Sequence, residues 1–140
     1  MKILAQTTIK TSAGPETIFA LWADVNHWSD FDHGIEWARL VGSFEAGGCY
    51  TIRPKGGPTV KATILVVEPY KTFVDVSHLP GAKLRFEHII REQQGHSTVT
   101  ITMSISGPLA WLWAKILGKN QQADLEKSTA SLIAKAEGHV

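Results

Sequence analysis

The C-terminal stretch from Gly107 to about Glu137 constrains the fold most, because its apolar residues recur three and four positions apart, as on one face of a helix. They are Leu109, Leu112, Trp113, Ile116, Leu117, Leu125, Leu132, Ile133 and Ala136. Gly118 costs about 1 kcal/mol relative to Ala inside a helix, so the helix is continuous, kinked or broken at that residue. At about 1.5 Å per residue it would be about 45 Å long, and it needs a large apolar surface to lie on.

The chain before this stretch is predicted to be mainly β-strand. Residues 2–11 alternate with a period of two, which is typical of a strand. Further strands are expected at 35–44, 48–54, 59–68, 72–79, 82–92 and 97–106. Short turns rich in Gly and Pro separate these strands, and connections this short join antiparallel neighbours.

Two short helices are expected between the first and second strands. Gly14-Pro15-Glu16 is typical of a helix start, because Pro is tolerated in the first turn and Glu is favourable there. A second helical piece is expected at 25–31. A seven-stranded antiparallel sheet with one apolar face needs a cover. We therefore expect an α+β fold, formed by residues 1–140 as one domain, in which the sheet curls around the C-terminal helix and the two short helices plug one end.

Composition and charge exclude several classes of protein. The formal net charge is +1 with no block of like charges, which argues against nucleic acid or an anionic membrane as the main partner. No run approaches the ~20 apolar residues of a membrane span, and the N-terminus lacks a signal-peptide core. The single cysteine, Cys49, excludes an intrachain disulfide and is expected to be a buried, inert thiol. A cytoplasmic location is the default expectation.

Three segments resemble the START-like, birch-pollen-allergen-like (SRPBCC) superfamily, in its polyketide cyclase/dehydrase and lipid-binding branch. They are Thr11-Ser-Ala-Gly-Pro-Glu-Thr-Ile-Phe19 with Ala23-Asp24-Val-Asn-His-Trp28, then Glu45-Ala-Gly47, and Ser106-Gly-Pro-Leu109. The resemblance implies a helix-grip fold whose hydrophobic cavity binds an apolar small molecule. A minority of members catalyse cyclisation, dehydration or hydrolysis in that cavity. No motif of the family that fixes catalytic residues is present in this sequence.

His88 is the candidate catalytic residue. In the strand 82–92, Leu84, Phe86 and His88 alternate with mostly charged residues, so these three are expected to face the cavity. An imidazole there could bind a polar group of a ligand or act as an acid/base, because it titrates near neutral pH. The alternative is a structural histidine whose hydrogen bonds are satisfied by the protein.

Other polar residues are harder to place. If Val74 and Val76 face inward on strand 72–79, His78 joins the cavity and Asp75 is in solvent, although Phe73 argues for the reverse. A local cluster of His and Asp residues is expected to be a solvated surface and no metal site, because it lacks metalloprotease spacing and a cysteine. Its members are His27, Asp30, Asp32 and His33.

Aromatic and apolar residues are expected to line the cavity. Trp28, Phe31 and Trp37 should close one end, while Trp113, Ile116 and Leu117 should form the wall opposite the sheet. Trp111 should lie toward the helix edge. The full expected ligand-binding set is Trp28, Phe31, Trp37, Tyr50, Leu84, Phe86, His88, Met103, Trp113 and Leu117.

Three function classes remain open. The first is a protein that binds a lipid, polyketide or aromatic metabolite. The second is a cyclase or dehydratase that uses His88 as acid/base, and the third is an interaction module with a collapsed cavity. Titratable side chains converging on one point would favour catalysis, and a lone polar group would favour binding. A small hydrophobic ligand is the expected partner, no cofactor is implied, and a homodimer is left open.

Overall fold

The computed structural model describes residues 1–138 and contains seven strands, two α-helices in the C-terminal part and two short helices near the N-terminus. The strands are β1 (Lys2–Thr11), β2 (Ile35–Val41), β3 (Cys49–Pro54), β4 (Val60–Glu68), β5 (Thr72–Leu79), β6 (Ala82–Gln93) and β7 (His96–Ser106). The helices are α1 (Pro15–Ala23), the 3-10 helix η1 (Val25–Asp30), α2 (Ala110–Leu117) and α3 (Gln121–Ala136). The predicted order of the strands and of the two short N-terminal helices is therefore confirmed.

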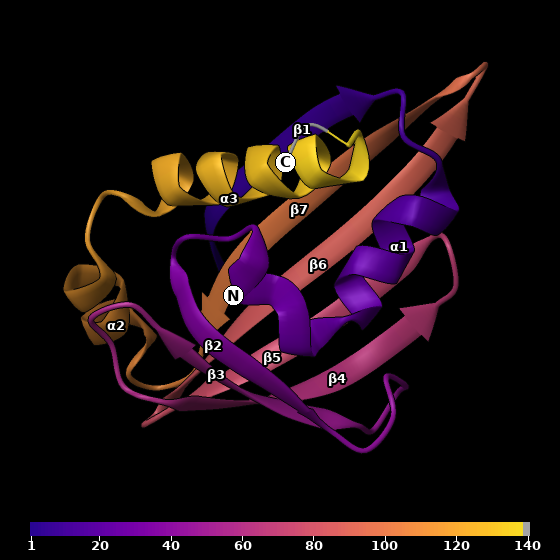
Figure 1. The fold of residues 1–140 in the computed structure, drawn as a ribbon. Coiled ribbons are helices and arrows are strands. Elements are labelled where there is room, and N and C mark those ends of the chain that lie inside the picture. The colour runs from indigo at the N-terminus through magenta and orange to yellow at the C-terminus, as the bar shows by residue number, and fades with distance from the viewer. Residues whose placement is uncertain (139–140) are drawn as a thin grey trace.

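The strands form one sheet in the order β1-β7-β6-β5-β4-β3-β2, and every neighbouring pair is antiparallel. The chain crosses from one edge of the sheet to the other between β1 and β2, and α1 and η1 lie in that crossing. Figure 1 shows α1 and α3 on the same face of the curled sheet, with β2 and β3 bending round beside them. The α+β helix-grip expectation is confirmed in this arrangement.

The C-terminal segment forms two helices. Of the possibilities left open at Gly118, the break is the one that the structure shows, and the continuous long helix is wrong. Gly118 has φ 80° and ψ −166°, a backbone conformation that side-chain-bearing residues rarely adopt. The helix α2 buries none of its residues, and Trp111 and Ile116 are each 61% exposed. Trp113, which was expected in the cavity wall opposite the sheet, is only partly buried.

The helix α3 is the element that covers the sheet. It buries Leu125, Thr129, Leu132 and Ile133. Its Gln122 side chain accepts from the Gln6 backbone N–H at 3.0 Å and donates to the Gln6 carbonyl at 2.8 Å. Since β1 is an edge strand, these two bonds satisfy backbone groups that have no neighbouring strand. They fix α3 along β1.

Two further observations concern the sequence expectations. Cys49 begins β3 and is exposed, so the expectation of a buried thiol is wrong. Within residues 1–138, no helix combines the length and apolar character needed to cross a membrane.

Candidate functional site

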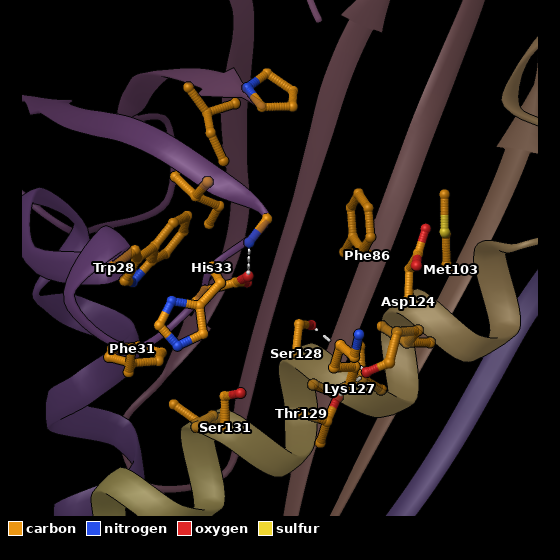
Figure 2. Close-up of a pocket in the computed structure, with 18 of the residues that line it drawn as sticks. Trp28, Phe31, His33, Phe86, Met103, Asp124, Lys127, Ser128, Thr129 and Ser131 are labelled. Atoms are coloured by element: carbon orange, nitrogen blue, oxygen red, sulfur yellow. Dashed lines mark hydrogen bonds between the residues drawn. The ribbon is translucent and has the colours of Figure 1, made fainter. Parts of the chain in front are cut away.

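A pocket of about 530 Å³ lies between α3 and the concave face of the sheet. Its sheet wall is formed by Tyr50, Ile52, Asp75, Ser77, Phe86, His88, Ile101 and Met103. Its helix wall is formed by Leu125, Ser128, Thr129, Ser131 and Leu132 of α3. Figure 2 shows Phe86 and Met103 of the sheet across this space from Ser128 of α3. The walls are mainly apolar because alternate residues of each strand point to the same face.

Aromatic rings close the end of the pocket next to η1. Trp28, Phe31 and Trp22 of α1 all line it. The Trp28 indole N–H donates to the carbonyls of Leu21 and Trp22 at 3.1 and 3.2 Å, which fixes the ring. Its ring meets Tyr50 edge to face, with centroids 5.0 Å apart. The Trp28 indole N–H and the Tyr50 hydroxyl both have hydrogen-bond partners within the protein. The two rings therefore present a rigid apolar surface to the pocket.

The Asp75 carboxyl is a buried polar group of the pocket wall. Tyr50 pairs across the sheet with the small residue Ala62, and its hydroxyl reaches over β4 to donate to Asp75 Oδ2. Asp75 is 2% exposed, and its Oδ1 has no hydrogen-bond partner within residues 1–138. Burial raises the pKa of Asp75 to about 7, although the Tyr50 hydrogen bond opposes this. The carboxyl is therefore partly protonated at neutral pH.

Tyr50 keeps its own proton. Burial raises the pKa of Tyr50 well above its usual value, and the nearby Asp75 charge raises it further. The phenol is therefore a fixed donor to Asp75 and holds that carboxyl in place.

His88 is a neutral acceptor on the same wall. Its Nδ1 lies 2.8 Å from the Phe73 carbonyl, and because a carbonyl can only accept, Nδ1 carries the proton. Burial lowers the pKa of His88 to about 4, so the imidazole is neutral at pH 7 and Nε2 keeps a lone pair. Phe73 stacks on the ring at 4.5 Å between centroids, and Trp22 meets it at 5.2 Å.

The mouth of the pocket is polar. It is formed by Asp32, His33 and Lys55 on the loop side and by Asp124 and Lys127 on α3. Figure 2 shows His33 on the side opposite Lys127. Asp32 Oδ1 accepts from the Gly34 N–H at 2.9 Å, and burial raises the pKa of Asp32. Within the described chain no group of three or more His, Cys, Asp or Glu side chains is arranged to hold a metal ion.

The structure brings six of the ten residues expected at the site onto the lining of the pocket. These six are Trp28, Phe31, Tyr50, Phe86, His88 and Met103. Trp37 lies outside, on the opposite face from buried Ala38 and under the Arg39 guanidinium at 5.0 Å. Leu84 is buried farther along β6, and Trp113 and Leu117 lie on α2, away from the pocket.

The expectation for strand 72–79 is wrong. Asp75 faces the pocket, whereas His78 is exposed, with its Nε2 2.8 Å from the Thr63 hydroxyl. Phe73, fully buried on the Asp75 face, was the sequence signal for the correct orientation. The two valines did not indicate which face of β5 lines the pocket, because β5 is buried on both faces. Val74 is 2% and Val76 is 7% exposed.

The family profile described as "Polyketide cyclase / dehydrase and lipid transport" matches residues 2–137. The chain belongs to this family. The resemblance to the SRPBCC superfamily is thereby confirmed. No curated protein matches the sequence significantly.

Solved structures share the fold at low sequence identity. A hypothetical protein from Helicobacter pylori is 11% identical with a TM-score of 0.77, covering 94% of this chain and 86% of its own. Norcoclaurine synthase from Thalictrum flavum, solved with dopamine and hydroxybenzaldehyde, is 10% identical with a TM-score of 0.72, covering 96% and 86%. The di-domain ARO/CYC StfQ of the steffimycin pathway is 11% identical with a TM-score of 0.78, covering 98% and 52%. At these identities the similarity is evidence for the fold alone.

Proposed function

We propose that this protein binds a small hydrophobic molecule in the pocket between α3 and the sheet. The observation that carries this proposal is the pocket itself, at about 530 Å³ with mainly apolar walls and a few fixed polar groups. Ligand pockets in proteins have volumes of roughly 300–1,000 Å³ and the same kind of lining. The family description and the norcoclaurine synthase structure support a small-molecule ligand.

A collapsed cavity, as an interaction module would have, does not agree with this volume. A mostly hydrocarbon ligand with one polar end matches apolar walls that carry Asp75 and His88, because a buried polar group needs a partner.

The test is to fill the pocket from α3. Ser128 lines the pocket, whereas Ala130 is exposed on the same helix and does not. Ser128→Trp should abolish binding of the apolar fluorophore dimethylaminonaphthalene, and Ala130→Trp should leave it unchanged, as measured by fluorescence titration. Equal binding by wild type and Ser128→Trp would show that the dye binds elsewhere and would overturn the proposal.

A second candidate is an enzyme of the cyclase or dehydratase type. The observation that favours it is that Tyr50, Asp75 and His88 lie on one wall, so more than one titratable side chain faces the ligand. His88, unprotonated at neutral pH, would act as the base through Nε2. In a dehydration assay with an aromatic β-hydroxy ketone, His88→Leu should lower turnover by roughly 10²–10⁴-fold. An unchanged rate would exclude His88 as the base.

A further inference from the structure

We propose that Asp75 is the polar anchor of the pocket, and that its neutral carboxyl donates a hydrogen bond from Oδ1 to a carbonyl oxygen of the ligand. The pocket would then select apolar ketones and aldehydes over hydrocarbons of the same shape. This inference rests on the proposed binding function and adds the chemical class of the ligand.

The position of Asp75 supports this role. It lies on the concave face of β5, opposite Ile64 of β4 and Phe86 of β6. Tyr50 occupies Oδ2, and Oδ1 is left buried without a partner in the described chain. An unpaired buried polar atom is costly, so a ligand atom that pairs with Oδ1 gains more than it would at an exposed site.

The surroundings of Asp75 favour its neutral form. Three ion pairs occur within residues 1–138, and none of them includes Asp75. The titratable groups that share its wall are Tyr50 from β3 and His88 from β6, and both are uncharged at neutral pH. A buried carboxyl with no cation beside it is harder to ionise, in agreement with its pKa of about 7, so Asp75 is mostly protonated at about pH 6.

The hydrogen-bonding groups of the pocket that remain available then indicate that the ligand atom at Asp75 is a carbonyl oxygen. The Tyr50 hydroxyl and the Trp28 indole N–H already donate within the protein. The ring of His88 donates from Nδ1 to Phe73, so its other nitrogen can only accept. With Tyr50 already held on Oδ2, the neutral Asp75 presents its O–H from Oδ1, and the complement of an O–H donor in an apolar site is a carbonyl oxygen.

Prodan, a naphthalene ketone, and dimethylaminonaphthalene, which lacks the carbonyl, are a matched pair of probes. Wild type should bind Prodan roughly three- to tenfold more tightly at about pH 6, the size of one hydrogen bond. This preference should disappear as the pH rises to about 9, because the ionised carboxylate cannot donate. Fluorescence titration gives both affinities, and hydrogen bonding of the Prodan carbonyl shifts its emission to the red.

Asp75→Asn provides the decisive variant. Its amide can accept from Tyr50 and still donate from nitrogen, so the preference for Prodan should persist and become independent of pH. Asp75→Leu should no longer prefer Prodan, but it should still bind dimethylaminonaphthalene. Asp30→Asn makes the same chemical change at an exposed residue outside the pocket and should behave as wild type.

The outcomes separate the two proposals. If neither probe binds, or both still bind Ser128→Trp, the proposed binding function fails. If both bind wild type equally at every pH, or the preference survives at high pH, binding stands and the role of Asp75 is overturned. A preference retained in Asp75→Leu would likewise assign the carbonyl to another donor.

Discussion

The helices α2 and α3 share one continuous apolar sequence pattern, yet α3 packs against the sheet and α2 is largely exposed to solvent. The helix α3 buries four residues, holds the edge strand through Gln122 and forms one wall of the pocket. The helix α2 buries none and leaves Trp111 and Ile116 mostly in solvent. The chain changes direction between the two helices (Figure 1), and Gly118, which follows α2, has φ 80° and ψ −166°. The comparison shows that an apolar stripe predicts a helix and its face, but does not identify what covers that face.

The largest expected effect compares two isoleucines. Ile133 on α3 is 5% exposed and Ile116 on α2 is 61% exposed, and neither lines the pocket. Ile133→Ala should lower the free energy of unfolding by roughly 2–5 kcal/mol through lost burial and the cavity left behind. Ile116→Ala should change it by less than about 0.5 kcal/mol. Urea denaturation of both variants measures the difference, and equal losses would mean that α2 is covered in solution.

The next effect concerns the polar groups beneath α3. Asp75 has a folded pKa of about 7 against an unfolded value of 3.8, so its contribution to stability falls as the pH rises from about 4 to about 7. His88 has a folded pKa of about 4 against 6.5, so its contribution falls as the pH drops from about 6.5 to about 4. With rising pH the contribution of Asp75 to stability falls while that of His88 increases. The two changes largely cancel, so together they should alter the stability of the wild type little between about pH 4.5 and 6.5.

Asp75→Asn removes the titration of residue 75 and leaves that of His88, so the difference between the two proteins reports the contribution of Asp75. The stability of wild type minus that of Asp75→Asn should decrease as the pH rises from about 4 to about 7, by up to about 1.4 kcal/mol per pH unit. Denaturant unfolding at several pH values provides the measurement. Parallel stability curves for the two proteins would mean that Asp75 is ionised in the folded state.

The smallest effect lies within α2. The Trp113 indole N–H donates to the Pro80 carbonyl at 2.7 Å, whereas Trp111 is 61% exposed with Lys115 over its ring. Trp113→Ala should therefore cost about 1–2 kcal/mol, because a half-buried ring and one hydrogen bond are lost. Trp111→Ala should cost less than about 0.5 kcal/mol. The reverse order in thermal or urea unfolding would contradict the contacts of α2.

Much of the fold could be predicted from the sequence, since period-two alternation and Gly-Pro turns determine an antiparallel sheet and most of its strand limits. The exception is β2, which was expected to reach residue 44 and ends at Val41. The facing of β6, and with it His88, also followed from charged residues on alternate positions. The facing of β5 did not, because a central strand buried on both faces has no polar side to mark it. Asp75 was missed for the same reason, and Trp37 was misplaced because its neighbour Ala38 is the inward residue.

The central claim is that apolar molecules bind beneath α3 and not on the exposed apolar face of α2. Backbone amide NMR during titration with dimethylaminonaphthalene tests it most directly, because each amide reports its own surroundings. We predict that the largest chemical-shift changes occur at His88, Ile101 and Leu132, which line the pocket. Changes confined to residues 109–117, with the pocket amides unmoved, would contradict the account.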